Sequence, residues 1–142
     1  MNVFLDTNVL LDVLMRRTGF CDSAAVLWEL AHRRLIAGHV AAISFNNIYY
    51  VLRRTDGQKR AREALRLLRD TFEIVAVDHM TINQSINSPV ADFEDAIQYQ
   101  CALRTGAAYL ITRNSGHFPA GGPAVVSPPE FLQIYGSTQR SV

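Results

Sequence analysis

The sequence is poor in the residues that build disulfide frameworks and zinc sites. It holds only two cysteines, Cys21 and Cys101, and neither has another cysteine or a histidine near it at metal-ligand spacing. We therefore predict two reduced thiols, at least one of them buried, because a free cysteine behaves mostly as a small hydrophobic residue. A disulfide scaffold and a structural zinc site are both disfavoured.

Long apolar runs are also missing. No stretch reaches the roughly 18 residues that a bilayer crossing needs, and the apolar run over residues 1–15 contains Asp6 and Asp12. A signal peptide begins with cations and has an uncharged core, so we expect a cytoplasmic protein. The apolar fraction of 49% and the charged fraction of 19% are those of a globular domain, and 142 residues can close a core.

Lysine is nearly absent, since Lys59 is the only one among fourteen basic residues. The net charge is just +1, yet residues 53–69 hold seven basic residues and two acidic ones. Arginine suits bidentate phosphate contacts better than lysine does. Four of these basic residues share one side of a predicted helix, opposite its apolar stripe: Lys59, Arg62, Arg66 and Arg69. They form either a solvated helix face or a surface that binds a nucleic-acid backbone.

Short β-rich runs alternate with helical periods. The predicted strands cover residues 2–6, 39–43, 72–77, 107–112 and 124–126, and the predicted helices cover residues 8–15, 22–34, 45–54, 58–70, 81–87, 92–104 and 128–135. Strands separated by helices predict a three-layer α/β/α fold with a parallel, about five-stranded sheet. Gly38 and Gly106 are predicted to end helices, and Ser44 to cap one. We expect a single domain over residues 1–135 and a flexible tail over residues 136–142.

Acidic residues stand where the predicted sheet would bind a ligand. Asp6 ends the first strand, while Asp92, Glu94 and Asp95 open the helix before the fourth. Ligands of open parallel sheets bind beyond the carboxyl ends of the strands, and the spacing of Asp92 and Asp95 brings both towards one helix face. Carboxylate oxygens are the ligands that Mg²⁺ prefers. As alternatives, Asp92 caps its helix and Asp95 interacts with the helix N-terminus, whereas Asp6 after an apolar strand is costly without a partner.

Three motifs occur in a characteristic order: LDTNVLLDVL, DFEDAIQYQCAL and YLITRN. Together they resemble the PIN-domain family, especially its VapC-like toxin branch, over residues 2 to about 129. The resemblance implies a doubly wound sheet and ribonuclease activity that depends on Mg²⁺ or Mn²⁺, with single-stranded or tRNA-like substrates. It also implies a small antitoxin partner and a homodimer.

The resemblance further implies roles for individual residues. Asp6 and Asp95 would be catalytic metal ligands, and Asp92 is a third candidate because it can face the same pocket. The residues expected to support the site are Thr7, Asn8, Asn47, Thr112 and Asn114. The arginines expected to bind RNA are Arg62, Arg66, Arg69 and Arg113. Asp12 is expected on another side of its helix, facing solvent or a cation.

The sequence departs from the family pattern at three positions. Asn47 and Asn114 stand where many members have acids, and His117 replaces a later acid. Two amides in place of two carboxylates weaken divalent-cation binding unless Asp92 compensates. Two functions therefore stay open: a metal-dependent endoribonuclease that is the toxin of a toxin–antitoxin pair, or a catalytically weak or inactive PIN-like protein that binds RNA or a protein partner without turnover. His117 is either a surface histidine or a metal ligand.

Other observations bear on alternative activities and on assembly. A phosphatase of the haloacid dehalogenase type needs a second acid where Asn8 stands, and no G-x-x-x-x-G-K phosphate loop is present. The helices near the N-terminus carry more apolar surface than one sheet face covers, which favours a homodimer. The residues behind this expectation are Leu11, Leu14, Phe20 and Trp28.

Overall fold

The structure, a computed structural model, describes residues 1–140 of the chain. Its strands are β1 (Asn2–Leu5), β2 (Ala37–Ala41), β3 (Glu73–Val75), β4 (Tyr109–Ile111) and β5 (Ala124–Val126). Its helices are α1 (Thr7–Leu14), α2 (Cys21–His32), α3 (Ala42–Asp56), α4 (Gln58–Thr71), α5 (His79–Ile86), α6 (Phe93–Thr105), the 3₁₀ turn η1 (Ser115–His117) and α7 (Pro128–Arg140). All strand pairs are parallel, in the order β3-β2-β1-β4-β5. The predicted parallel α/β/α fold is confirmed.

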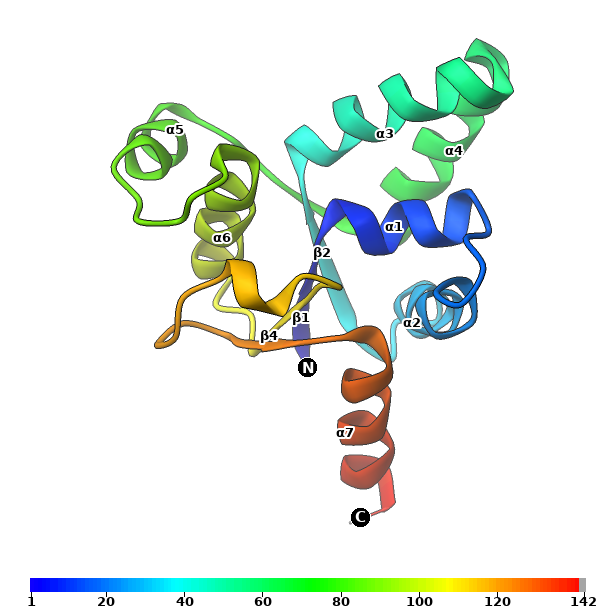
Figure 1. Cartoon of the computed structure of the whole chain (residues 1–142). Helices are drawn as coiled ribbons and strands as arrows, with labels where there is room; N and C mark the ends of the chain where they lie inside the picture. Colours follow the sequence, from blue (N-terminus) through cyan, green and yellow to red (C-terminus); the bar gives the residue numbers. More distant parts are fainter. Residues whose placement is uncertain (141–142) are drawn as a thin grey trace.

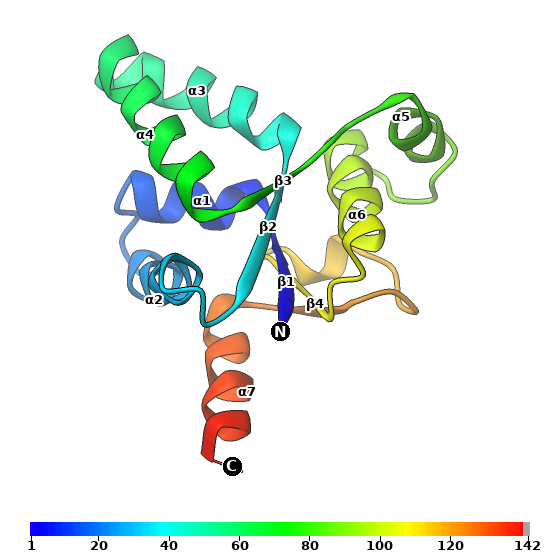
Figure 2. The same ribbon diagram turned by 180° about the vertical axis from the view of Figure 1, so that it is seen from behind.

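Helices cover both faces of the sheet, because side chains alternate between the two faces of each strand. Val3 and Leu5 of β1 join a core with α1, α2, α3, α4 and α7, whereas Phe4 joins a second core with α6. Figures 1 and 2 show the α3–α4 pair and the α5–α6 pair on opposite sides of β1 and β2. The carboxyl ends of the central strands lie between these two helical layers.

Several helix ends follow the sequence signals. Asp92 caps α6 by accepting a hydrogen bond from the Asp95 N–H at 2.9 Å. Gly106 ends the same helix with a left-handed φ of 65°, which glycine adopts without a steric penalty. In the part of the chain that is described, no helix combines the length and the apolar character that a membrane span requires.

Two positions have roles other than the predicted ones. Gly38 does not end a helix but lies in β2, where a Cβ would stand 2.7 Å from the Phe72 ring. Ser44 does not cap α3, because this helix already begins at Ala42; its hydroxyl is buried and hydrogen-bonds Thr7 at 2.7 Å. In both cases a tertiary contact decides the role.

The C-terminal helix extends into the segment that was expected to be a tail. Helix α7 runs to Arg140, five residues beyond the expected end of the domain at residue 135. The last two residues of the expected tail, 141 and 142, lie outside the described part of the chain. Both cysteines are free thiols and Cys101 is buried, as predicted.

Candidate metal centre

The site begins where β1 and its neighbour β4 end. Leu5 pairs with Ile111 across the two strands, so the residues that follow them, Asp6 and Thr112, meet at the same sheet edge. The Thr112 hydroxyl donates a hydrogen bond to Asp6 Oδ2 at 2.8 Å. The Thr7 N–H donates to Asp6 Oδ1 at 2.7 Å, so Asp6 also caps α1. Asp6 is therefore held at both carboxylate oxygens.

The first turn of α6 brings two more carboxylates to Asp6. Glu94 and Asp95 each present an oxygen, and these oxygens and one from Asp6 all lie within 4.8 Å of one another. Asp6 and Asp95 are largely buried, and Glu94 is partly exposed. We refer to these three residues as the carboxylate cluster.

Crowding and burial make the charged state of the cluster costly. Burial raises the pKa of Asp6 above its usual range, and the nearby Asp95 charge adds to this, while the Thr112 hydrogen bond opposes it. Burial and then the Asp6 charge raise the pKa of Glu94 to about 7. Burial also raises the pKa of Asp95, against the hydrogen bond from His117. Three carboxyl groups whose pKa values are raised together, mainly by burial, mark this place as a candidate functional site.

Asp92 lines the same pocket as Asp95, as predicted, but it does not join the cluster. Its Oδ1 accepts the Asp95 N–H in the helix cap, and its side chain is exposed. The capping alternative therefore describes its contact, and Glu94 takes the third position. Glu94 was visible in the sequence only as another acid at the helix start.

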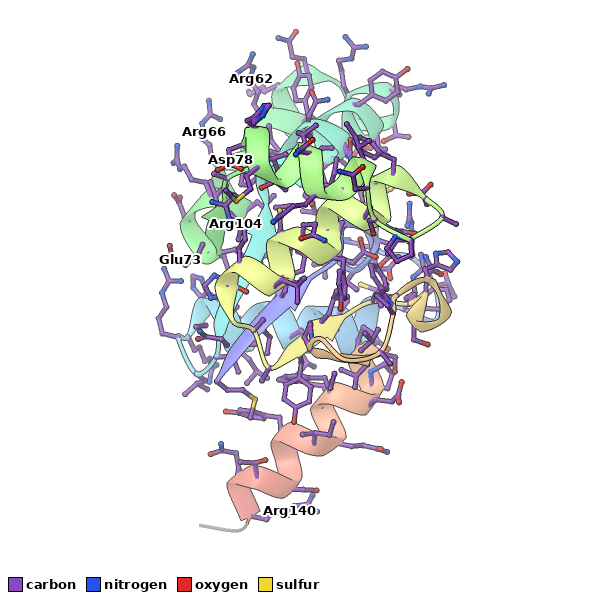
Figure 3. The ribbon with its side chains drawn as sticks, turned by 90° about the vertical axis from the view of Figure 1, so that its left-hand side faces the viewer. Arg62, Arg66, Glu73, Asp78, Arg104 and Arg140 are labelled. Atoms are coloured by element: carbon purple, nitrogen blue, oxygen red, sulfur yellow. The ribbon has the colours of Figure 1, made fainter. Side chains whose placement is uncertain are left out.

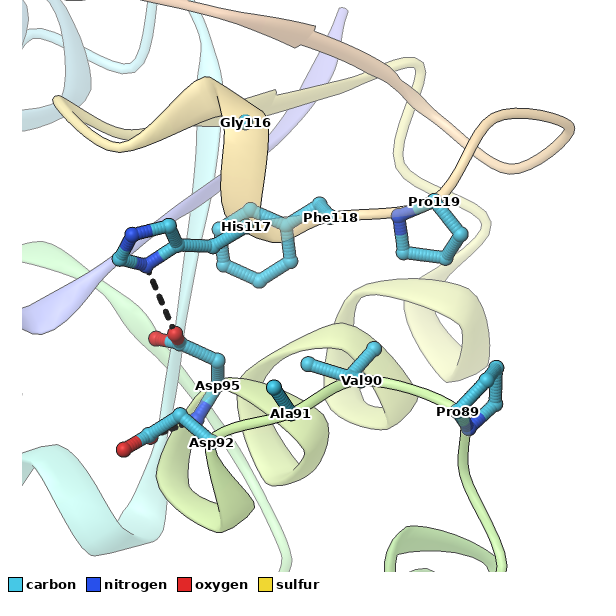
Figure 4. Close-up of a pocket in the computed structure, with 9 residues that line it drawn as sticks. All are labelled: Pro89, Val90, Ala91, Asp92, Asp95, Gly116, His117, Phe118 and Pro119. Carbon is cyan, nitrogen blue, oxygen red and sulfur yellow. Dashed lines mark hydrogen bonds and ion pairs between the residues drawn. The ribbon is translucent and has the colours of Figure 1, made fainter.

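A pocket of about 440 Å³ opens beside the cluster. Asp92 and Asp95 line one side and His117 and Phe118 the other, as Figure 4 shows. The His117 Nδ1 lies 3.0 Å from Asp95 Oδ2, and its side chain is 55% exposed. His117 thus stands at the surface, as one of the two alternatives predicted, and it contacts Asp95 without belonging to the carboxylate cluster.

A buried polar network lies directly behind the cluster. The Gln98 Nε2 is 2.9 Å from Thr7 Oγ1 and 3.1 Å from Ser44 Oγ, and the two hydroxyls are 2.7 Å apart. The same nitrogen is 3.4 Å from Glu94 Oε2. Gln98 was not among the predicted site residues, since one polar residue within an apolar helix face does not reveal its partners.

Comparison with known proteins identifies the family. The PIN-domain family model matches residues 2–116. The chain belongs to the PIN-domain family. Its carboxylate cluster thus lies on a PIN domain, as the ordered motifs predicted. A search of curated protein sequences found no match.

Solved structures similar to this PIN domain come from toxin–antitoxin systems. A chain of a toxin–antitoxin complex from Klebsiella pneumoniae is 25% identical, with a TM-score of 0.66 and coverage of 89% of this chain and 97% of that chain. A chain of Rickettsia felis VapBC2 bound to a promoter DNA fragment is 14% identical, with a TM-score of 0.67 and coverage of 88% and 97%. Mycobacterium tuberculosis VapC20, a sarcin-ricin loop cleaving toxin, is 16% identical, with a TM-score of 0.63 and coverage of 76% and 86%.

The three expected supporting asparagines of the PIN domain occupy different environments. Asn8 Oδ1 is buried and has no hydrogen-bond partner among residues 1–140. Asn47 is partly buried on α3, and Asn114 is exposed. The Asn114 N–H donates to Thr112 Oγ1 at 3.1 Å, which helps to hold the threonine that binds Asp6. The structure thus gives Asn114 a backbone role next to the site.

The predicted RNA-binding arginines separate into two groups. Arg62, Arg66 and Arg69 are exposed on α4. Figure 3 shows Arg62 and Arg66 pointing outward along one edge, on the opposite side of the view from η1. Arg113 instead forms an ion pair with the fully buried Asp12 at 2.8 Å and stacks on the Phe20 ring at 4.1 Å.

Asp12 also settles an alternative that the sequence left open. Its carboxylate faces cations rather than solvent, because Arg17 lies 3.4 Å away in addition to Arg113. Arg113 is therefore occupied in the folded protein, and a role in RNA binding would compete with this ion pair.

Proposed function

We propose that this PIN domain is a metal-dependent endoribonuclease, the toxin of a toxin–antitoxin pair. The observation that carries the proposal is the convergence of Asp6, Glu94 and Asp95, whose carboxylate oxygens lie within 4.8 Å of one another. Family membership supports it. So do the neighbours, because VapC20 is a sarcin-ricin loop cleaving toxin and the Klebsiella pneumoniae chain comes from a toxin–antitoxin complex.

The donor set fits Mg²⁺ or Mn²⁺, which are hard cations that take oxygen ligands. Within residues 1–140, no arginine or lysine forms an ion pair with the three carboxylates, so their charge is left for another cation. When bound, such a cation lowers the pKa of a coordinated water and neutralises charge on a phosphate. Asp6, Glu94 and Asp95 would hold it, while Thr112 and the Thr7 N–H keep Asp6 in place.

A cleavage assay tests the reaction. Wild-type protein should cleave RNA faster with Mn²⁺ than with Mg²⁺, because Mn²⁺ generally binds such sites more tightly, and cleavage should stop in EDTA. Asp6→Asn and Asp95→Asn should each reduce cleavage to background without unfolding the protein. Asp22→Asn, which alters an exposed acid on α2, is the matched control and should keep full activity. Cleavage that persists in EDTA or in Asp6→Asn would contradict the proposal.

The alternative is a PIN domain that binds RNA or a protein partner without turnover. It is favoured by Asn47 and Asn114, which stand where the family resemblance implies acids. If the missing charges limit the rate, the double variant Asn47→Glu/Asn114→Asp should cleave faster than wild type. Tight RNA binding with no cleavage in either protein, with Mn²⁺ bound, would establish the alternative.

We also propose RNA, a small antitoxin and a second copy of the chain as partners. The antitoxin is supported by the similarity to chains from toxin–antitoxin complexes. The RNA is supported by the exposed arginines of α4. Arg62 and Arg66 lie away from η1 (Figure 3), so an RNA that contacts both α4 and the cluster would touch the protein at two separate places.

A further inference from the structure

Gln98 lies at the junction of three segments that form the site. It is fully buried on α6, and its amide nitrogen lies near Thr7 of α1, Ser44 of α3 and Glu94 one turn earlier on α6. Thr7 directly follows Asp6, and its N–H binds the Asp6 carboxylate. One side chain therefore links the segments that carry Asp6 and Glu94.

The groups around the Gln98 amide determine which of them donates each hydrogen bond. A deprotonated Glu94 can only accept hydrogen bonds, so the amide N–H is the matching partner for Glu94 Oε2. The Thr7 and Ser44 hydroxyls can each accept from the amide, and one of them donates to the other. The other amide atom, Gln98 Oε1, is buried without a hydrogen-bond partner among the described residues. A buried polar atom without a partner costs stability, which offsets part of what the amide gains from its hydrogen bonds to Thr7 and Ser44.

We propose that Gln98 is a positioning residue of the carboxylate cluster, holding Glu94 in register with Asp6 so that both serve one cation. The inference rests on the proposed metal binding. Gln98 acts through Glu94 and Thr7 and does not itself reach the cation. Groups that orient metal ligands in this way typically change metal affinity by about 10- to 100-fold when they are replaced.

The test is isothermal titration of the metal-free full chain with Mn²⁺. Gln98→Met keeps the length of the side chain and removes the donor, so the Kd for Mn²⁺ should rise by about 10-fold or more. The matched control is Gln100→Met, which alters a partly exposed glutamine on another face of α6 and should keep the wild-type Kd. An equal Kd in both variants overturns the inference, even if Gln98→Met has a lower Tm without metal.

Two further measurements separate positioning from mere stability. In the Glu94→Gln background, Gln98→Met should leave the already weakened Kd unchanged, because the two residues act as one unit. A further rise of equal size overturns the inference.

If Gln98→Met does not fold, Gln98→Asn keeps the amide but withdraws it from Glu94, and the same criterion applies to it. A wild-type protein that binds no Mn²⁺ removes both the proposed function and this inference, whereas normal wild-type binding with an unchanged variant removes the inference alone.

Discussion

Among single residues, Glu94 links the site to pH near neutrality. Its pKa rises to about 7, because the side chain is partly removed from water and lies beside Asp6 and Asp95. The pKa values of Asp6 and Asp95 are raised as well. At neutral pH, the metal-free protein therefore keeps like charges together at a cost to its stability.

The sign of the pH effect follows from the raised pKa of Glu94. Between the usual value of 4.5 and about 7, the folded state binds a proton that the unfolded state has released. The contribution of Glu94 to the stability of the metal-free protein is therefore largest below pH 4.5, and it falls as the pH rises to about 7. We expect the Tm of metal-free wild type to fall over this range, and the fall to be smaller in Glu94→Gln.

Mn²⁺ should reverse this trend, because it binds the deprotonated cluster and stabilises the folded state. The increase in Tm on adding Mn²⁺ should be larger at pH 7.5 than at pH 5. Scanning calorimetry at both pH values measures it. The same Tm profile in wild type and Glu94→Gln would show that Glu94 does not carry the raised pKa.

At the scale of elements, the buried ion pair between Asp12 and Arg113 joins α1 to the segment between β4 and η1. Asp12 is fully buried, and Arg113 directly follows Thr112, which holds Asp6. Removing one partner of a buried pair leaves an uncompensated charge, which usually costs about 3–5 kcal/mol. Arg17 at 3.4 Å remains as a second partner and reduces the cost.

We therefore expect Arg113→Met to lower the free energy of unfolding by about 2–3 kcal/mol, measured in urea. Arg17→Met is the natural comparison and should cost less, because Arg17 is farther from Asp12 and more exposed. Equal losses in the two variants would contradict the assignment of Arg113 as the main partner of Asp12.

The arginines of α4 give a prediction about substrate binding. Arg62→Gln/Arg66→Gln should weaken the binding of long RNAs of any sequence and lower the salt dependence by about 0.7 per lost phosphate contact on a single strand. The control Arg33→Gln/Arg140→Gln removes the same charge elsewhere and should bind as wild type does. An RNA that binds at the carboxylate cluster and is too short to reach α4 should bind the α4 variant and the control variant with equal affinity. If the α4 variant keeps wild-type affinity and salt dependence on long RNA, the arginines are a solvated helix face.

The elements themselves were largely predictable, whereas the contacts that fix the site were not. Apolar periodicity located the strands and helices because burial is repeated many times along each element. Single residues such as Gly38 and Ser44 have roles that depend on Phe72 and Thr7, which are distant in sequence. Glu94 instead of Asp92 is the third member of the cluster for a similar reason, since helical spacing does not show which acid will cap the helix. The meeting of Asp6 and Thr112 was easier to predict, because adjacent parallel strands end at the same edge of the sheet.

The whole molecule exposes most of its apolar surface in places other than the N-terminal helices that the sequence indicated. Leu11 and Trp28 are each only 8% exposed, so the monomer already covers them, whereas Phe20 stays 46% exposed although Arg113 lies over its ring. The most exposed large apolar side chains among the described residues are Met80 and Ile86, at 63% and 64%. Both lie on α5, which forms the outer side of the α5–α6 pair (Figure 1). A homodimer that covers apolar surface would therefore use α5 as its interface.

We therefore expect light scattering at micromolar concentration to give twice the 15.9 kDa mass of the chain. Ile86→Lys should shift the population to monomer, because a charge in an apolar interface loses its hydration without gaining a partner. Leu35→Lys is the control, since Leu35 is 54% exposed but lies between α2 and β2, and it should leave the dimer intact. A wild-type monomer would rule out the homodimer at this concentration. A dimer that Ile86→Lys leaves unchanged would exclude α5 as its interface, because a buried lysine there could not be accommodated at the same affinity.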